Sequence, residues 1–164
     1  MRHPGVLLHV HSVKPESKKI GSWREIALIV FMFAPLAILL HAVSPIPQDP
    51  NYHLLADARA FMGVANFANI ASNLGFLIVG LLGLALCLGR GVAGASRSWT
   101  TCFLAVTLVA LGSAYYHAHP DNGTLVWDRL PMAIAFMALF SAVVAEHLRP
   151  GLERVLLPLA VATG

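Results

Sequence analysis

Long apolar runs, separated by short polar segments, dominate the chain. Five such runs cover residues 26–43, 67–88, 100–116, 130–145 and 155–164. A helix needs about 20 residues to cross the ~30 Å hydrocarbon core of a bilayer, and the first four runs are close to that length. Because backbone N–H and C=O groups in lipid must be paired within their own segment, these four runs are predicted to be transmembrane helices.

The fifth run, 155–164, is too short to cross a bilayer and is predicted to be the start of a fifth helix. A carboxyl terminus inside the membrane would leave its charge and its last carbonyl groups without partners. We therefore expect an incomplete part of a larger all-α polytopic bundle. The expected organisation is a basic N-terminal segment, 1–25, followed by a membrane domain, 26–164.

The composition supports a membrane protein and excludes other classes. Hydrophobic residues make up 57% of the 164 residues and charged residues 12%, with a mean hydropathy of +0.71, whereas about a quarter of an average soluble domain is charged. These values exclude a disordered chain and an ordinary water-soluble enzyme. No basic cluster alternates with aromatic residues, so membrane lipids and not nucleic acids are the expected partners. No GxxxG spacing lies on a clear lipid-facing side, so no dimer is predicted.

The basic residues predict the orientation of the chain in the membrane. Nine of the eleven fall on one predicted side: Arg2, Lys14, Lys18, Lys19, Arg24, Arg90, Arg97, Arg149 and Arg154. Only Arg59 and Arg129 fall on the other side. Since positive residues concentrate in cytoplasmic loops, the N-terminus is predicted to be cytoplasmic, and segments 44–66 and 117–129 are predicted to lie outside.

One polar stretch, 112–132, carries the candidate chemistry. Ser113 and His117 are four residues apart, which places them on one face of a helix, one turn apart. Asp128 is expected to begin the next helix on the same side of the membrane. The three side chains are therefore predicted to meet near the outer leaflet, at a depth where ionisable groups are costly and indicate function.

These residue types suit a metal-dependent hydrolase, and two other interpretations fit the same spacing. An imidazole can ligate Zn²⁺, a carboxylate can act as a general base, and a hydroxyl can donate to an oxyanion. Alternatively, His117 and His119 are interfacial loop residues and Asp128 caps the following helix. A serine-hydrolase triad is a third interpretation, although the chain has no Gly-x-Ser-x-Gly turn.

The same stretch resembles the alkaline ceramidase family, which belongs to a wider group of heptahelical hydrolases that includes the adiponectin receptors. The resemblance lies in Ser113-x3-His117 followed by Asp128, within the strings GSAYYH and WDRLPM. It also lies in NFANIASNLGF of the second run, which is similar to the Asn-x-x-Ser-Asn signature of the family. These motifs extend from residue 51 to about residue 140.

The resemblance implies a fold, a reaction and a role for each candidate residue. The fold would be a seven-helix ceramidase-like core that begins at about residue 51, is incomplete at its C-terminus, and follows an extra N-terminal helix. The reaction would be hydrolysis of the amide of a ceramide-like lipid to a sphingoid base and a fatty acid. His117 would be one of three zinc ligands, Ser113 would stabilise the oxyanion, and Asp128 would contact or activate the zinc-bound water.

The chain also departs from the family pattern at both metal sites. The family takes its other two zinc ligands from a His-x-x-x-His pair on a late helix, and this chain has no such pair, so we expect the chain by itself to be inactive. Calcium binding is not expected, because Asp57 and Asn66 stand at plausible positions without the neighbouring carboxylates that a calcium site needs. The alternative function is a non-catalytic receptor-like or scaffold-like membrane protein that retains the motifs of the fold.

Overall fold

The computed structural model describes residues 23–44, 48–55, 57–89 and 94–164. Most of the predicted basic segment, 1–25, lies outside these ranges. The described residues are largely helical, and their one β-type pairing is an isolated bridge between Phe61 and Val64 in a loop. The predicted all-α fold is confirmed.

The helices match the predicted apolar runs, with different ends. Those in the described part of the chain are α1 (Trp23–Ala42), α2 (Phe67–Ser72), α3 (Leu74–Gly89), α4 (Ser96–Ala118), α5 (Asn122–Leu148) and α6 (Glu153–Thr163), with 3₁₀ turns at Pro50–His53 and Pro150–Leu152. Within the described ranges, four spans are long and apolar enough to cross a membrane: α1, α2 with α3, α4, and α5. The eleven residues of α6 agree with the predicted start of a fifth helix.

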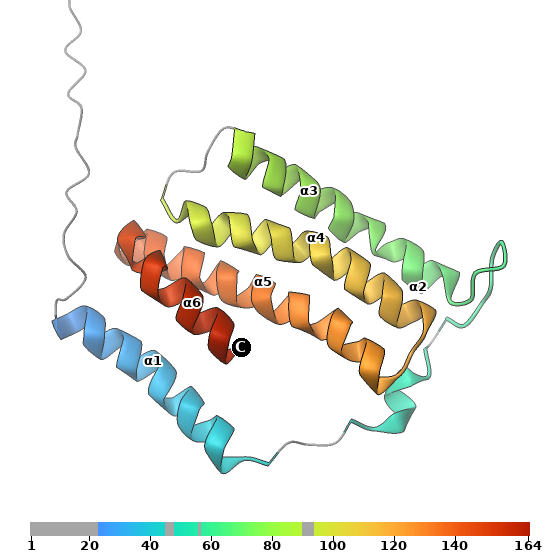
Figure 1. The fold of residues 1–164 in the computed structure, drawn as a ribbon, viewed down its shortest axis with the longest axis horizontal. Coiled ribbons are helices and arrows are strands. Elements are labelled where there is room, and N and C mark those ends of the chain that lie inside the picture. The colour runs from blue at the N-terminus through green and yellow to red at the C-terminus, as the bar shows by residue number, and fades with distance from the viewer. Residues whose placement is uncertain (1–22, 45–47, 56, 90–93) are drawn as a thin grey trace, which may run out of the picture.

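The helices form a layer of antiparallel neighbours (Figure 1). α3, α4 and α5 lie side by side in chain order, and α6 turns back along α5. α1 lies on the far side of α6 and diverges from α5 toward the loop that leads to the Pro50–His53 turn. The loop with the Pro50–His53 turn therefore lies near the end of α4 and the beginning of α5, which are far from it in the sequence.

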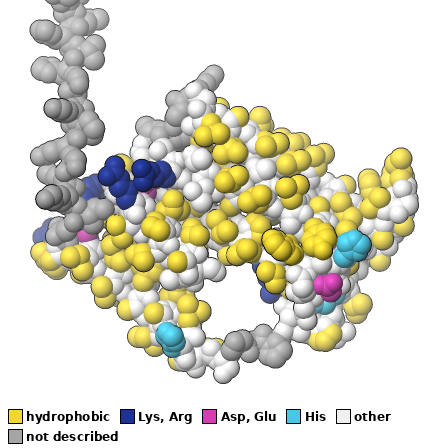
Figure 2. Space-filling view, in the orientation of Figure 1, with side chains coloured by type: hydrophobic (Ala, Val, Ile, Leu, Met, Phe, Trp, Pro, Cys, Tyr) yellow, Lys and Arg dark blue, Asp and Glu magenta, His cyan; other side chains and the backbone are white. Residues whose placement is uncertain are grey.

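The outer surface of this layer is apolar. Phe31 of α1 is 78% exposed and Leu88 of α3 is 72% exposed, and α1 has no buried residue. Large apolar side chains cover much of the face seen in Figure 2. Such a surface is stable against lipid and would be costly in water, which supports an integral membrane protein.

The basic side chains of the described residues are divided between the two ends of the bundle. Because the helices alternate in direction, Arg24, Arg97, Arg149 and Arg154 lie at one end, and Arg59 and Arg129 lie at the other. Figure 2 shows arginine side chains gathered near the beginning of α1, with acidic side chains beside them, and histidine and acidic side chains near the opposite end. This separation agrees with the two groups of basic residues from which the orientation in the membrane was predicted. Which end of the bundle faces the cytoplasm stays a prediction.

Glycines allow α3 and α4 to approach closely. A Cβ atom added to Gly80 would lie 2.4 Å from the hydroxyl oxygen of Thr107 and 2.6 Å from its backbone nitrogen. One added to Gly83 would lie 2.1 Å from the ring of Phe103. Since lipid provides no hydrophobic force between helices, this close backbone packing is what holds them together.

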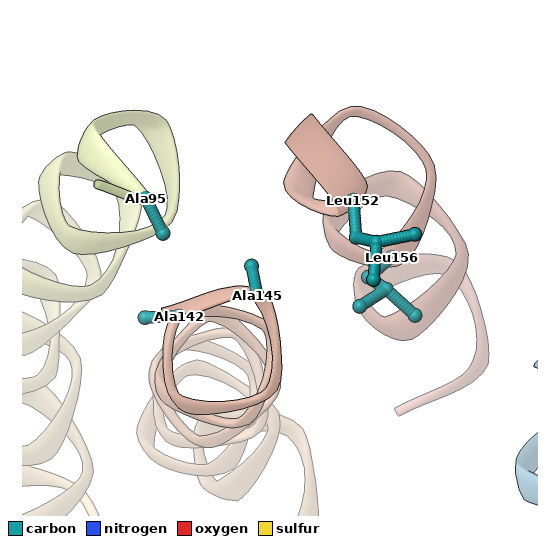
Figure 3. Close-up of a cluster of buried hydrophobic side chains, with 5 residues drawn as sticks. All are labelled: Ala95, Ala142, Ala145, Leu152 and Leu156. Atoms are coloured by element: carbon teal, nitrogen blue, oxygen red, sulfur yellow. The ribbon is translucent and has the colours of Figure 1, made fainter. Parts of the chain in front are cut away.

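A cluster of small and aliphatic side chains joins α4, α5 and α6 at the end where α4 begins. It consists of Ala95, Ala142, Ala145, Leu152 and Leu156, each at most 1% exposed (Figure 3). Ile29 and Phe33 of α1 pack against this cluster. Arg149 also forms an ion pair with Glu25 of α1, with 2.9 Å between Nη2 and Oε2. α1 is therefore attached to the bundle near its own beginning.

A buried carboxylate connects α6 to the start of α4. Glu153, only 8% exposed, accepts a hydrogen bond of 3.1 Å from the backbone N–H of Ser98. That N–H belongs to the first turn of α4, where backbone donors lack partners within the helix and the helix dipole favours a negative charge. The Ser98 hydroxyl lies 3.1 Å from that of Ser141 on α5. Through its backbone N–H and its hydroxyl, Ser98 therefore connects α4 to both α6 and α5.

The beginning of α5 corrects the sequence-based prediction. Asp128 was expected to begin this helix, but α5 begins two turns earlier, at Asn122. The reason is a capping box: Asp121 accepts from the Thr124 N–H at 2.7 Å, and the Asp121 N–H donates to the Thr124 hydroxyl at 3.1 Å. Asp128 is therefore a residue of the second turn of α5 and does not cap it.

We predict that removal of the Glu153 carboxylate destabilises the bundle. Glu153→Ala leaves the Ser98 N–H buried without its acceptor, which should lower the free energy of unfolding by about 1–3 kcal/mol. Glu153→Gln keeps an acceptor and should cost less. Thermal unfolding in detergent micelles measures both effects, with the exposed neighbour Arg154→Ala as control. Equal melting temperatures for Glu153→Ala and the control would contradict the prediction.

A second prediction concerns the cap of α5 and its pH dependence. The hydrogen bond from the Thr124 N–H holds the pKa of Asp121 below its ordinary value of 3.8. A lowered pKa in the folded state means that the cap stabilises the protein above pH ~4 and that this contribution is lost as the pH falls through the folded pKa. Asp121→Ala should lower the melting temperature by a few degrees at pH 7.

The matched control for this experiment is Asp121→Asn, which keeps an acceptor but does not titrate. The melting temperatures of the wild type and Asp121→Asn should converge as the pH falls from 5 to 3. A constant difference over that range would refute the assigned cap.

Candidate functional site

The end of α4 and the beginning of α5 touch where the candidate residues lie. A Cβ atom added to Gly112 would be 1.9 Å from the carbonyl oxygen of Trp127 and 3.5 Å from the backbone nitrogen of Asp128. Only glycine allows the two backbones to come this close. Ser113, next to Gly112, and Asp128, next to Trp127, are therefore at the same level of the bundle.

Ser113 faces the interior of the bundle. It is 7% exposed and belongs to the buried side of α4 together with Val109, Ala110 and Tyr116. A hydroxyl in this position is shielded from bulk water. It can therefore donate to a developing negative charge in a medium of low dielectric constant, where such a hydrogen bond is strong.

His117 follows Ser113 by one helical turn and is half-buried. Its Nδ1 atom is buried and makes no hydrogen bond with any residue of the described ranges. Its backbone carbonyl accepts a hydrogen bond of 2.9 Å from the side-chain amide of Asn66. A buried imidazole nitrogen without a protein partner is what a metal ligand or a proton acceptor requires.

Asp128 lies beside the packed side of α5. It is half-buried, and the residues one turn before and after it, Thr124 and Pro131, are both buried. The described structure contains no hydrogen bond or ion pair that joins Ser113, His117 and Asp128 to one another. Their arrangement is therefore not a serine-hydrolase triad, in which these groups must be hydrogen-bonded in series.

The donors present would supply only part of a zinc site. His117 offers one unpaired imidazole nitrogen, and Asp128 offers a carboxylate at the same end of the bundle. Across the described ranges, no group of three or more His, Cys, Asp or Glu side chains is placed to hold a metal ion. Catalytic zinc normally has three protein ligands. His117 could supply one of them, with Asp128 as a neighbouring carboxylate, so the described residues do not complete such a site.

His53 is a residue of this region that sequence analysis did not single out as a candidate. It belongs to the 3₁₀ turn after α1, yet its Nδ1 lies 3.1 Å from the hydroxyl of Tyr116 and its Nε2 lies 2.9 Å from Oδ1 of Asn122. The loop is thereby fastened over the junction of α4 and α5. No spacing rule could have found these contacts, because the partners are 63 and 69 residues away in the chain.

One member of the polar run in the second span, which consists of Asn66, Asn69, Ser72 and Asn73, forms a hydrogen bond to another helix. Asn66 donates to His117 of α4. Asn69 donates at 2.7 Å to the carbonyl of Asp57 in the preceding loop. Ser72 and Asn73 both bond to the carbonyl of Asn69 within their own segment, where α2 ends and α3 begins. The bonds of Ser72 and Asn73 thus lie at the break between α2 and α3. The bond of Asn66 connects the span to His117.

Asp57, one of the plausible calcium positions, is engaged by an arginine. Its Oδ1 accepts from Arg59 Nε at 2.7 Å and from the Arg59 backbone N–H at 3.2 Å, and its Oδ2 accepts from Nη2 at 3.1 Å. These hydrogen bonds hold the pKa of Asp57 below its ordinary value and raise that of Arg59. A guanidinium thus occupies both oxygens of the carboxylate that a cation would need.

Comparison with known proteins identifies the family. A family model described as Ceramidase matches residues 59–164. This segment runs from the loop before α2 to the end of the chain, contains Ser113, His117 and Asp128, and leaves α1 outside. No curated protein and no solved structure matches the chain. The match covers more than half of the sequence, and the chain therefore belongs to the ceramidase family.

Proposed function

We propose that this protein is a membrane-embedded, zinc-dependent amide hydrolase that cleaves the N-acyl bond of ceramide-like lipids. The observation that carries the proposal is the contact at Gly112, which brings Ser113 and Asp128 to one level of the bundle, with His117 one turn from Ser113. The family supports a hydrolase that acts on amide bonds.

Each residue has a task in this reaction that follows from its chemistry. The Nδ1 of His117, buried and without a hydrogen-bond partner in the described structure, would hold the metal. When bound, Zn²⁺ lowers the pKa of water and polarises a carbonyl. The Asp128 carboxylate would orient the attacking water and accept its proton. The Ser113 hydroxyl would donate to the oxygen of the amide carbonyl as it becomes negative.

The surroundings of these residues suit a lipid substrate. The outer face of the bundle is apolar, so an acyl chain can reach the junction of α4 and α5 from the bilayer without crossing water. The buried position of Ser113 excludes bulk water from the oxyanion side of the site. A slowly hydrolysed amide needs this combination of a Lewis acid, an oriented water and an apolar slot.

We further propose that the 164-residue chain does not form this site alone. His117 is one nitrogen ligand where three protein ligands are normal, so the purified chain should bind zinc weakly and hydrolyse no ceramide. Zinc content after dialysis against micromolar Zn²⁺ tests this. One tightly held zinc ion per chain would refute the proposal that the chain is incomplete.

Substitution at the three residues tests the reaction in any form of the protein that hydrolyses a lipid amide. His117→Ala should reduce kcat/KM at least about a thousandfold, because the metal is lost. Ser113→Ala and Asp128→Asn should reduce it by about 10² or more. His119→Ala, an exposed histidine at the end of the same helix, should leave the rate nearly unchanged. Hydrolysis of a fluorescent ceramide measures these rates, and hydrolysis that survives both His117→Ala and a chelator would exclude the zinc mechanism.

The α4–α5 contact can be tested separately from the chemistry. Gly112→Ala places a methyl group on the Trp127 carbonyl and forces the two helices apart, so it should lower the free energy of unfolding by about 1–3 kcal/mol and impair the site. Gly75→Ala is the matched control, since a Cβ atom there meets nothing within 4 Å. Equal melting temperatures for these two variants would show that the contact is not required.

A further inference from the structure

His53 uses both nitrogens of its imidazole to connect α4 with α5. It belongs to the 3₁₀ turn Pro50–His53, which passes the junction of the two helices (Figure 1). Its Nδ1 lies 3.1 Å from the hydroxyl oxygen of Tyr116, in the last turn of α4, and its Nε2 lies 2.9 Å from Oδ1 of Asn122, in the first turn of α5. A single loop side chain therefore joins the two helix ends that carry the candidate site.

The groups around this imidazole determine its protonation state. An amide oxygen can only accept, so Nε2 carries a proton and donates to Asn122. A neutral ring then accepts at Nδ1, and the Tyr116 hydroxyl donates to it. A protonated ring would donate at both nitrogens and would leave the Tyr116 hydroxyl proton without an acceptor among the described residues, at a side chain that is 2% exposed. The hydrogen bonds thus run in one direction, from Tyr116 through His53 to Asn122.

The same loop holds the last turn of α4 at His117. The ring centre of Tyr116 lies 5.2 Å from that of His117. From a later part of the loop, the side-chain amide of Asn66 donates at 2.9 Å to the backbone carbonyl of His117. Carbonyl groups in the last turn of a helix lack partners within the helix. The loop therefore supplies a partner for the backbone of His117 and fixes the aromatic ring beside its imidazole.

We infer that His53 is a positioning residue of the candidate site, and that it acts as a neutral imidazole with its proton on Nε2. Its two hydrogen bonds hold the end of α4 against the beginning of α5, so that His117 keeps its position relative to Asp128. Misplacement of reacting groups by about 1 Å can reduce a rate about a hundredfold. The effect on turnover rests on the proposed function, whereas the protonation state and the two hydrogen bonds do not.

NMR of the purified chain in dodecyl maltoside micelles tests the protonation state without turnover. With ¹⁵N-labelled histidine, the nitrogen chemical shifts distinguish an imidazole that is protonated at Nε2 from one that is protonated at Nδ1. The signals of His53 are assigned by their loss in His53→Asn. At pH 8 we expect a proton on Nε2 and none on Nδ1. A proton on Nδ1 would overturn the inference.

Backbone hydrogen exchange of residues 115–125 in the same sample measures how firmly the two helix ends are held. Tyr116→Phe removes only a hydroxyl and should accelerate exchange there about three- to tenfold, as expected for the loss of one hydrogen bond. Tyr115→Phe, at a neighbour that is 51% exposed, is the matched control and should exchange like the wild type. In a His53→Ala background, Tyr116→Phe should have little further effect. Independent, multiplicative effects of the two substitutions would contradict the link.

Kinetics in a form of the protein that hydrolyses a lipid amide separate positioning from stability. His53→Ala should lower kcat about tenfold or more with little change in KM, because the substrate still binds while the reacting groups are misaligned. His53→Asn should recover part of the loss, since its Oδ1 can replace Nδ1 as the acceptor for Tyr116. His147→Ala, at an exposed histidine near the other end of α5, is the control.

A wild-type kcat in His53→Ala would overturn the positioning role. Absence of amide hydrolysis in the wild-type protein would instead contradict the proposed function. In that case the protonation state and the exchange rates still decide whether His53 links the two helices.

Discussion

The close contact of α4 with α5 is the constraint on which the rest of the molecule depends. Lipid does not drive helices together as water does, so two apolar helices associate only where their surfaces fit closely. Small buried residues of both helices, such as Ala105 of α4 and Ala138 and Ala142 of α5, allow this fit. At the end that carries the candidate site, it comes from Gly112 against the Trp127 carbonyl.

Polar contacts hold the two ends of this pair, while small apolar residues fill its length. At one end, the Glu153 carboxylate bonds to the first turn of α4 and the Ser98 and Ser141 hydroxyls lie together. At the other end, His53 lies between Tyr116 and Asn122. Hydrogen bonds at both ends restrict sliding and rotation of α4 against α5, which keeps Ser113 and Asp128 at a common level.

The two sides of α5 differ in chemistry. Toward α4, α5 carries Asp128, at the level of the buried Ser113 of α4. Arg129, the next residue, is exposed and donates at 3.0 Å to Gln48 of the loop after α1.

The sequence by itself determined the membrane-spanning helices and the level of the candidate residues. Apolar runs near 20 residues can only be helices in lipid, and the i,i+4 spacing of Ser113 and His117 holds wherever a helix forms. The start of α5 was predicted six residues too late, at Asp128, because residues 122–127 show no long apolar run, while the helix there depends on the Asp121 cap. Only the tertiary structure decided which faces meet, because helical periodicity does not say which neighbour covers a face. The Gly112 contact, the attachment of His53 and the bond of Arg129 to Gln48 all depend on residues that are distant in the chain.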